Sequence, residues 1–108
     1  MIPWKVQFLD PTVEIEVEAL PDDIQAKLFR IIDLIEQFGL VAMREPYVKH
    51  LEKSLWEMRM KGRDGIARAI YVTVSGKRAV VVRVFRKKTQ KTPRSELQLA
   101  LKRAENVR

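Results

Sequence analysis

The chain has 108 residues, of which 46% are hydrophobic, with a formal net charge of +7 and no cysteine. This length suffices for one hydrophobic core, so we expect a single domain over residues 1–108. The lack of cysteine excludes disulfides, thiolate metal ligands and cysteine nucleophiles, and no apolar run approaches the roughly 20 residues that cross a bilayer. Because the first residues also lack the pattern of a signal peptide, we expect a cytoplasmic protein with no membrane partner.

The charges are unevenly distributed along the chain. Residues 1–52 carry five basic and ten acidic side chains, whereas residues 53–108 carry 16 basic and four acidic ones. This asymmetry favours a polyanionic partner for the second half, with nucleic acid as the first candidate and an acidic protein as the second. A basic surface that is merely solvated is the alternative.

The first twenty residues predict a short strand followed by a short helix. Apolar and polar residues alternate along residues 4–9, as in a strand, and Asp10 and Pro11 then suit a turn or the start of a helix. Residues 13–20 fit a helix with Asp10 as N-cap, but they also alternate as a strand would. We favour the helix.

A longer helix follows. Pro21 and two aspartates suit a helix N-terminus, and apolar residues then recur at helical spacing from Ile24 to Phe38. Gly39 is the usual residue for ending such a helix. Residues 40–52 contain a proline that blocks a helix, and we expect a loop there.

The second half predicts a meander of three antiparallel strands over residues 54–61, 66–74 and 79–85, joined by two tight turns. Thr92 as N-cap and Pro93 as first helical residue then begin a final helix. We therefore expect an α+β domain whose small antiparallel sheet combines the N-terminal strand with the meander. Two N-terminal helices and a C-terminal helix are expected on one face of this sheet, leaving the other face partly open.

Cations stand in strands that otherwise look like core. Alternation along residues 54–61 puts Glu57, Arg59 and Lys61 on one face, opposite the methionines. Arg68 shares a face with apolar residues of the second meander strand, which makes a purely solvated role less natural. We place Arg83 on one face with Val81 and Phe85.

Each cation also has a plainer interpretation. Arg59 could form a solvated ion pair with Glu57, and Arg83 could line an exposed edge. The run from Arg86 to Lys88, together with Lys91, is typical of a solvated turn and by itself supports only nonspecific affinity for phosphate.

The residue inventory narrows the chemistry. With His50 as the one histidine and no carboxylate cluster in the basic half, neither a metal site nor a Ser-His-Asp arrangement is supported, and we expect His50, Trp56 and Tyr71 to be structural. What remains is cation-assisted cleavage of RNA by its own 2′-hydroxyl group, which needs a proton acceptor, a proton donor and positive charge at the phosphorane. The residues that could converge for this purpose are Arg59, Arg68, Lys87 and Lys88.

Three segments carry a family resemblance, namely residues 55–59 (LWEMR), 64–71 (DGIARAIY) and 85–93 (FRKKTQKTP). In this order and spacing they resemble the RelE/HigB-like toxins of bacterial type II toxin–antitoxin systems, in the phage-derived HigB-like branch of the RelE superfamily. The resemblance implies a RelE-like fold and a metal-independent endoribonuclease, without a cofactor, that cuts mRNA on the ribosome. It also implies neutralisation by a cognate antitoxin, commonly a helix-turn-helix protein, in a complex of two chains or in a heterotetramer.

The resemblance also implies roles for individual residues. Arg59 and Arg68 match the strand arginines that hold the scissile phosphate in relatives, and Lys87 and Lys88 match the basic loop that follows the last strand. Some relatives place an aromatic or histidine acid-base near the C-terminus, where this chain has Leu97, so the candidates for acid and base are Glu57, Lys87 and Lys88. The residues expected to contact RNA around the site are Lys61, Arg83, Arg86 and Lys91.

Two other functions stay open at this point. One is a non-nucleolytic toxin that binds a protein target such as DNA gyrase, and the other is an inactive domain that only binds RNA or an antitoxin.

Overall fold

The structure is a computed structural model that describes residues 3–43, 47–88 and 91–108. Its elements in chain order are β1 (Lys5–Phe8), α1 (Pro11–Glu18), α2 (Asp22–Phe38), the short 3-10 helix η1 (Leu40–Ala42), β2 (Val48–His50), β3 (Trp56–Gly62), β4 (Gly65–Val74), β5 (Arg78–Lys87) and α3 (Arg94–Ala104). The predicted α+β class is confirmed, as are the three helices, the N-terminal strand and the meander.

The sheet differs from the prediction in two respects. Across the described residues it has five strands in the order β1-β5-β4-β3-β2, and β1 pairs with β5 in parallel, so the sheet is mixed rather than antiparallel. The fifth strand, β2, lies in residues 40–52, where a loop was expected. The pairing of β1 with β5 joins segments about seventy residues apart in sequence, and no local pattern reports such a contact.

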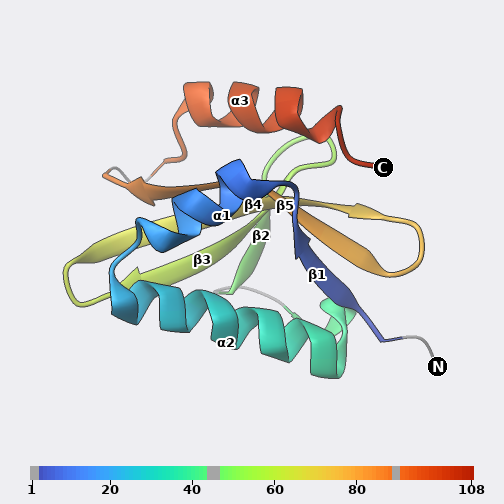
Figure 1. Cartoon of the computed structure of the whole chain (residues 1–108), viewed down its shortest axis with the longest axis horizontal. Coiled ribbons are helices and arrows are strands. Elements are labelled where there is room, and N and C mark those ends of the chain that lie inside the picture. Colours follow the sequence, from blue (N-terminus) through green and yellow to red (C-terminus); the bar gives the residue numbers. More distant parts are fainter. Residues whose placement is uncertain (1–2, 44–46, 89–90) are drawn as a thin grey trace.

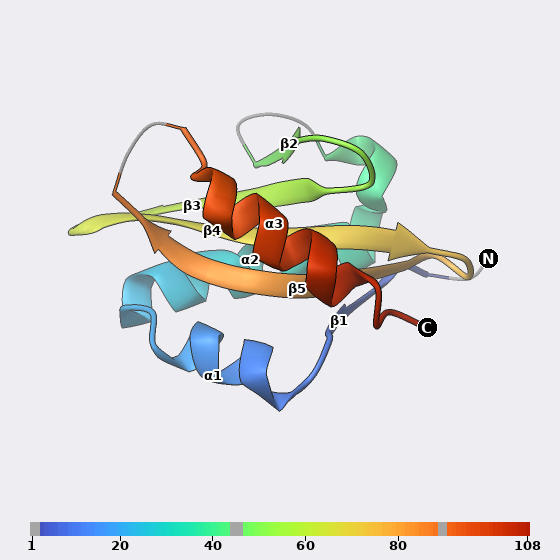
Figure 2. The ribbon, with the colours of Figure 1, turned by 90° about the horizontal axis from the view of Figure 1, so that it is seen from above.

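Helices cover both faces of the sheet, which corrects the expectation of a partly open face. Figure 1 shows α2 below the sheet and α3 above it, and Figure 2, seen from above, shows α3 crossing the strands and α1 beside β5 and β1. Two apolar clusters match these layers. The larger joins α1 and α2 to one face of β3–β5, and the smaller joins Ala100 of α3 to the other face. Charged side chains on the central strands are therefore placed where burial is the default.

The N-terminal helices form as their sequence indicates. Oδ1 of Asp10 accepts a hydrogen bond of 3.2 Å from the amide of Val13, so the predicted N-cap and the choice of helix over strand are confirmed. In α2 the predicted stripe is buried except for Phe38, which is 66% exposed, and the helix ends at Gly39 with a φ of +85°. No helix in the described parts of the chain has the length and apolar character needed to cross a membrane.

The start of α3 differs by one residue from the prediction. Pro93 rather than Thr92 occupies the N-cap position, and no side chain caps the helix. Thr92 instead directs its hydroxyl group back toward β3, where it donates a hydrogen bond of 3.0 Å to Glu57. The residue predicted as a cap thus belongs to the candidate site.

Candidate functional site

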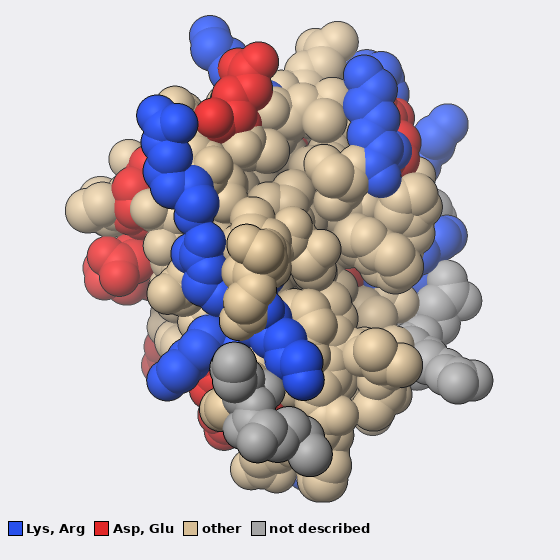
Figure 3. Space-filling view, turned by 90° about the vertical axis from the view of Figure 1, so that its right-hand side faces the viewer, with Lys and Arg blue, Asp and Glu red and all other residues tan. Residues whose placement is uncertain are grey.

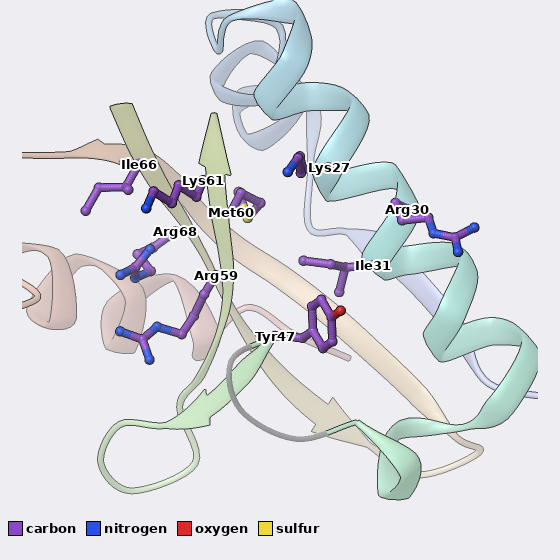
Figure 4. A pocket seen from close by; sticks show the side chains of 9 residues that line it. All are labelled: Lys27, Arg30, Ile31, Tyr47, Arg59, Met60, Lys61, Ile66 and Arg68. Atoms are coloured by element: carbon purple, nitrogen blue, oxygen red, sulfur yellow. The ribbon is translucent and has the colours of Figure 1, made fainter. Parts of the chain in front are cut away.

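The register of the meander aligns the predicted site residues on the face of the sheet covered by α3. Arg59 of β3 lies directly beside Arg68 of β4, and the next row along the strands carries Lys61, Ile66 and Lys87. Figure 4 shows the side chains of Arg59, Lys61 and Arg68 extending to the same side of the sheet, away from α2. The alternation predicted from sequence is confirmed here, and it brings several cations together.

Glu57 is the anionic centre of this group. It is 2% exposed, and its Oε2 atom lies 3.5 Å from Nε of Arg59 and 3.4 Å from Nε of Arg68. Its Oε1 atom accepts the hydrogen bond from Thr92. A buried carboxylate persists only when cations and donors compensate it, so Glu57 and the two arginines form one unit.

Arg68 is 5% exposed, which is unusual for an arginine. Its NH1 group donates a hydrogen bond of 2.9 Å to the carbonyl oxygen of Ala67, while its buried Nε has no hydrogen-bond acceptor in the described part of the chain. Burial lowers the pKa of Arg68 below its usual value, and the Glu57 carboxylate opposes this shift. The guanidinium is therefore fixed in place by the fold, with Nε 3.4 Å from Oε2 of Glu57 but not aligned for a hydrogen bond with it.

Lys87 completes the cluster from β5 and is 7% exposed. Burial lowers its pKa, repulsion by the Arg68 charge lowers it further, and Arg59 and Lys49 act in the same direction, while Glu57 opposes them. A lysine crowded by cations in this way releases its proton more readily than a solvated one.

A cleft of about 270 Å³ opens onto this cluster. Arg59, Glu57 and Lys87 form its inner wall, and its rim includes Lys49 and His50 of β2 and Lys91 and Thr92 before α3. His50 is held by a contact of 2.8 Å between Nε2 and the carbonyl oxygen of Lys53 and stacks against Trp56 at 4.8 Å. This agrees with the structural role expected of it.

Two members of this cleft, Lys49 and Thr92, are not recognisable from the sequence. Lys49 pairs directly with Glu57 across β2 and β3, but β2 has three residues and no strand signal that distinguishes it from a loop. Thr92 was assigned to a helix cap, and only the tertiary fold brings it to Glu57.

Two of the predicted RNA contacts, Arg83 and Arg86, lie away from the cleft. Arg86 pairs with Ala67 on the opposite face of the sheet from Arg68, and its NH2 group is 3.4 Å from the carbonyl oxygen of Asp64. Lys88 is exposed just after β5, and Lys61 is exposed at the end of β3.

Arg83 is engaged in ion pairs away from the cleft. It lies 2.6 Å from Glu96 of α3 and 2.7 Å from Glu16 of α1, and the bond to Glu96 is the main cause of its raised pKa. The prediction that Arg83 shares a face with Val81 and Phe85 is correct for Phe85 and wrong for Val81. The guanidinium of Arg83 lies 5.8 Å from the Phe85 ring, whereas Val81 packs in the core on the other face of the sheet. The cause is an irregularity in the pairing of β4 with β5, where Ile70 pairs with Arg83 and Tyr71 pairs with Val81, so the alternation of side chains along β5 shifts by one residue.

Positive charge is not confined to this site. Figure 3 views the end of the molecule where both termini lie, and lysines and arginines also project there, around a mainly uncharged centre. The candidate site is distinguished by buried, converging cations and not by net charge. Within the described residues, no three His, Asp or Glu side chains gather as metal ligands would.

Comparisons with known proteins agree with this fold. Residues 16–105 match the model of the family described as phage derived protein Gp49-like (DUF891). The structure is similar to RelE in the archaeal RelE–RelB complex from Pyrococcus horikoshii OT3, with a TM-score of 0.58 and 22% identity over 80% of this chain and 96% of that one. It is also similar to a free arginine double mutant of the E. coli toxin RelE, with a TM-score of 0.60 and 15% identity over 94% of this chain and 97% of that one. No curated protein sequence matches the chain.

The family match spans most of the chain, and both structural matches extend over nearly the whole length of the RelE chains. The resemblance inferred from sequence is thereby confirmed for family and fold, and the chain belongs to the Gp49-like family of phage-derived proteins, with the fold of the RelE toxins.

Proposed function

We propose that this chain is the toxin of a type II toxin–antitoxin system and that it cuts mRNA on the ribosome. Family membership and the RelE fold support a toxin. The observation that carries the nuclease assignment is the convergence of Arg59, Arg68 and Lys87 around the buried Glu57, with Arg59 and Lys87 at the wall of a cleft.

The proposed reaction is attack of a ribose 2′-hydroxyl group on the adjacent phosphorus. A bond from the 2′-oxygen to phosphorus forms, the bond to the 5′-oxygen breaks, and the products are a 2′,3′-cyclic phosphate and a 5′-hydroxyl group. Arg59 and Arg68 would stabilise the phosphorane, because the guanidinium fork matches phosphate oxygens and fixed cations favour the charge that develops there.

Protons must move on both sides of the phosphorus. Lys87 is the stronger candidate for the acid that protonates the leaving 5′-oxygen, because its environment lowers its pKa, whereas Lys88 is exposed; the proton of the 2′-hydroxyl group would pass to water in the cleft. We assign Glu57 a positioning role, because both of its carboxylate oxygens are engaged by neighbouring side chains. It keeps the two guanidinium groups in place and is too buried to meet the substrate directly.

The proposed partner is a cognate antitoxin whose acidic segment covers the basic cleft. The RelE chain that resembles this protein was solved as a RelE–RelB complex, which supports a proteinaceous partner. We propose that this antitoxin is a helix-turn-helix protein and that toxin and antitoxin form a heterotetramer. Because charge complementarity at a rim is screened by salt, we expect association to slow as ionic strength rises.

The test is cleavage of a defined mRNA by the purified protein, with and without translating ribosomes, followed by mapping of the new 5′ ends. We expect cuts only with ribosomes, and a loss of about a hundredfold or more in the Arg59→Ala variant. Arg78→Ala, at the far end of β5, is the matched control. If a folded protein arrests growth without cutting RNA, the proposal is wrong and a protein target takes its place.

A further inference from the structure

A second groove runs along the edge of β3, on the other side of Arg59 from the cleft. Strand β2 pairs with Trp56, Glu57 and Met58, and the amide of Arg59 donates a bond of 2.8 Å to the carbonyl oxygen of Tyr47, which is the last bond along this edge among the described residues. The remaining edge of β3 faces α2 across a cavity of about 420 Å³. Figure 4 looks into this cavity.

The lining of the groove combines cations with apolar surface. The lining includes Lys27 and Arg30 of α2 on one side and three cations of β3 and β4 on the other, namely Arg59, Lys61 and Arg68. Figure 4 shows the guanidinium of Arg30 on the outer side of α2 and the three strand cations extending away from α2, so the positive charge lies along the two rims of the groove. Ile31 and Met60 form an apolar floor, and among the described residues no aspartate or glutamate lines the groove. An anionic ligand with apolar or aromatic parts is the chemical match for such a surface.

Tyr47 adds an aromatic ring at the mouth of the groove. It is 49% exposed, and Figure 4 shows its ring standing between the β2 segment and α2, next to Ile31. Exposed aromatic rings beside cations are typical of proteins that bind single-stranded nucleic acid, because each base offers a face for stacking.

The groove is continuous with the candidate active site. Arg59 lines both cavities, and Arg68, its neighbour across the strands, lines the groove. We propose that the groove between the β3 edge and α2 binds the nucleotides that flank the scissile phosphate of the same RNA strand. Lys27 and Arg30 would contact phosphates, and Tyr47 would stack on a base.

An added peptide strand fits this edge less well than RNA. Tyr47 occupies one end of the edge, and at the other end Gly62 packs against Ile24 and Asp23 of α2. The amide of Arg63 is already bound to Oδ2 of Asp23 at 2.7 Å. Between these two ends the described part of β3 offers only a few backbone groups, too few for a stable extra strand.

This inference rests on the proposed function, and its test measures the binding of RNA that cannot be cleaved. The probes are 2′-O-methyl RNA strands of about four and about twelve nucleotides, which lack the attacking hydroxyl group and span a short and a long site. Affinity is measured by fluorescence anisotropy over a range of salt concentrations for the intact protein, Lys27→Gln/Arg30→Gln and Tyr47→Leu. The control, Lys5→Gln/Lys102→Gln, removes two exposed cations on β1 and α3.

We expect the double variant to bind the long strand about tenfold or more weakly, with a log–log salt slope shallower by about 1.4, because two phosphate contacts are lost. Tyr47→Leu should weaken the long strand by about tenfold. Both should leave the short strand bound as before, and the control should resemble the unmodified protein.

Equal losses for both strand lengths, or a loss no larger than that of the control, would overturn the inference. A double variant that binds a polyglutamate peptide more weakly but binds RNA as before would also overturn the inference, since the groove would then fit an acidic protein segment. Absence of cleavage on ribosomes would contradict the proposed nuclease function, whereas the binding experiment tests the groove alone. The two proposals can therefore fail separately.

Discussion

Thr92 Oγ1 donates a hydrogen bond of 3.0 Å to Oε1 of Glu57, and thereby connects the segment before α3 to the middle of β3. Both side chains are buried. The bond fixes one carboxylate oxygen and leaves Oε2 facing Arg59 and Arg68. The start of α3 therefore helps to hold the cationic cluster in place.

Replacing Thr92 by valine tests this connection. Valine keeps the shape of the side chain but leaves Oε1 of Glu57 without its donor, and we expect the free energy of unfolding to fall by about 1 to 2 kcal/mol. Urea denaturation measures the change. Thr73→Val is the control, because Thr73 is exposed on β4 and should change stability little. Equal stability of the two variants would show that the bond contributes nothing.

Replacing Glu57 by glutamine should be more damaging. The change removes the one carboxylate that contacts Arg59 and Arg68 in the described structure and leaves buried positive charge uncompensated, so we expect a loss of about 3 kcal/mol. Glu52→Gln is the matched control: its ion pair is with Arg94, whose side chain is 64% exposed, and should contribute less than about 1 kcal/mol. If both variants unfold at the same urea concentration, Glu57 is not the compensating charge.

The lowered pKa of Lys87 predicts a pH-dependent stability. The folded state releases this proton at a lower pH than the unfolded chain does, so between the two pKa values the unfolded chain binds more protons and stability rises with pH. The window lies just below the ordinary lysine value of 10.5. The Lys87→Met variant should lack this contribution, so its unfolding free energy should rise less steeply across the window.

Denaturation curves taken from neutral to alkaline pH check this. Lys88→Met is the control, because Lys88 is exposed at the neighbouring position, and its curve should run parallel to that of the unmodified protein. A Lys87→Met curve that also runs parallel would contradict the shift and weaken the case for Lys87 as the proton-transfer group.

Local sequence signals were sufficient for most elements. The alternation around Arg59, the helical spacing in α2 and the Asp10 cap each report the environment of a few neighbouring residues, and each led to the correct element. The pairing of β1 with β5 and the placement of α3 on the second face depend on contacts between distant segments, so they were missed.

The site shows the same division. Glu57, Arg59 and Arg68 could be placed on one face from alternation and the expected turn. Thr92 and Lys49 could not, because a cap motif gave Thr92 a plausible local role and β2 is too short to leave a pattern. Lys27, Arg30 and Tyr47 are brought to the β3 edge only by the packing of α2 and β2 against β3.

The contact between Gly62 and α2 predicts which turn glycine is essential for the groove. A Cβ atom at Gly62 would lie 2.5 Å from Cγ1 of Ile24 and 2.6 Å from Oδ2 of Asp23, so Gly62→Ala forces these side chains of α2 to shift, and with them the packing of α2 on the end of β3. We expect a loss of about 1 to 3 kcal/mol, because overpacking forces such shifts.

Gly65→Ala is a matched control in the same turn. A Cβ atom there would meet only NH2 of Arg86, at 3.3 Å, and this long exposed side chain can move aside. Thermal denaturation of both variants distinguishes the two positions. Because α2 carries Lys27 and Arg30, Gly62→Ala should also weaken binding of the long RNA strand, whereas Gly65→Ala should not. A Gly62→Ala protein as stable as Gly65→Ala would show that the close packing of α2 on β3 is not required.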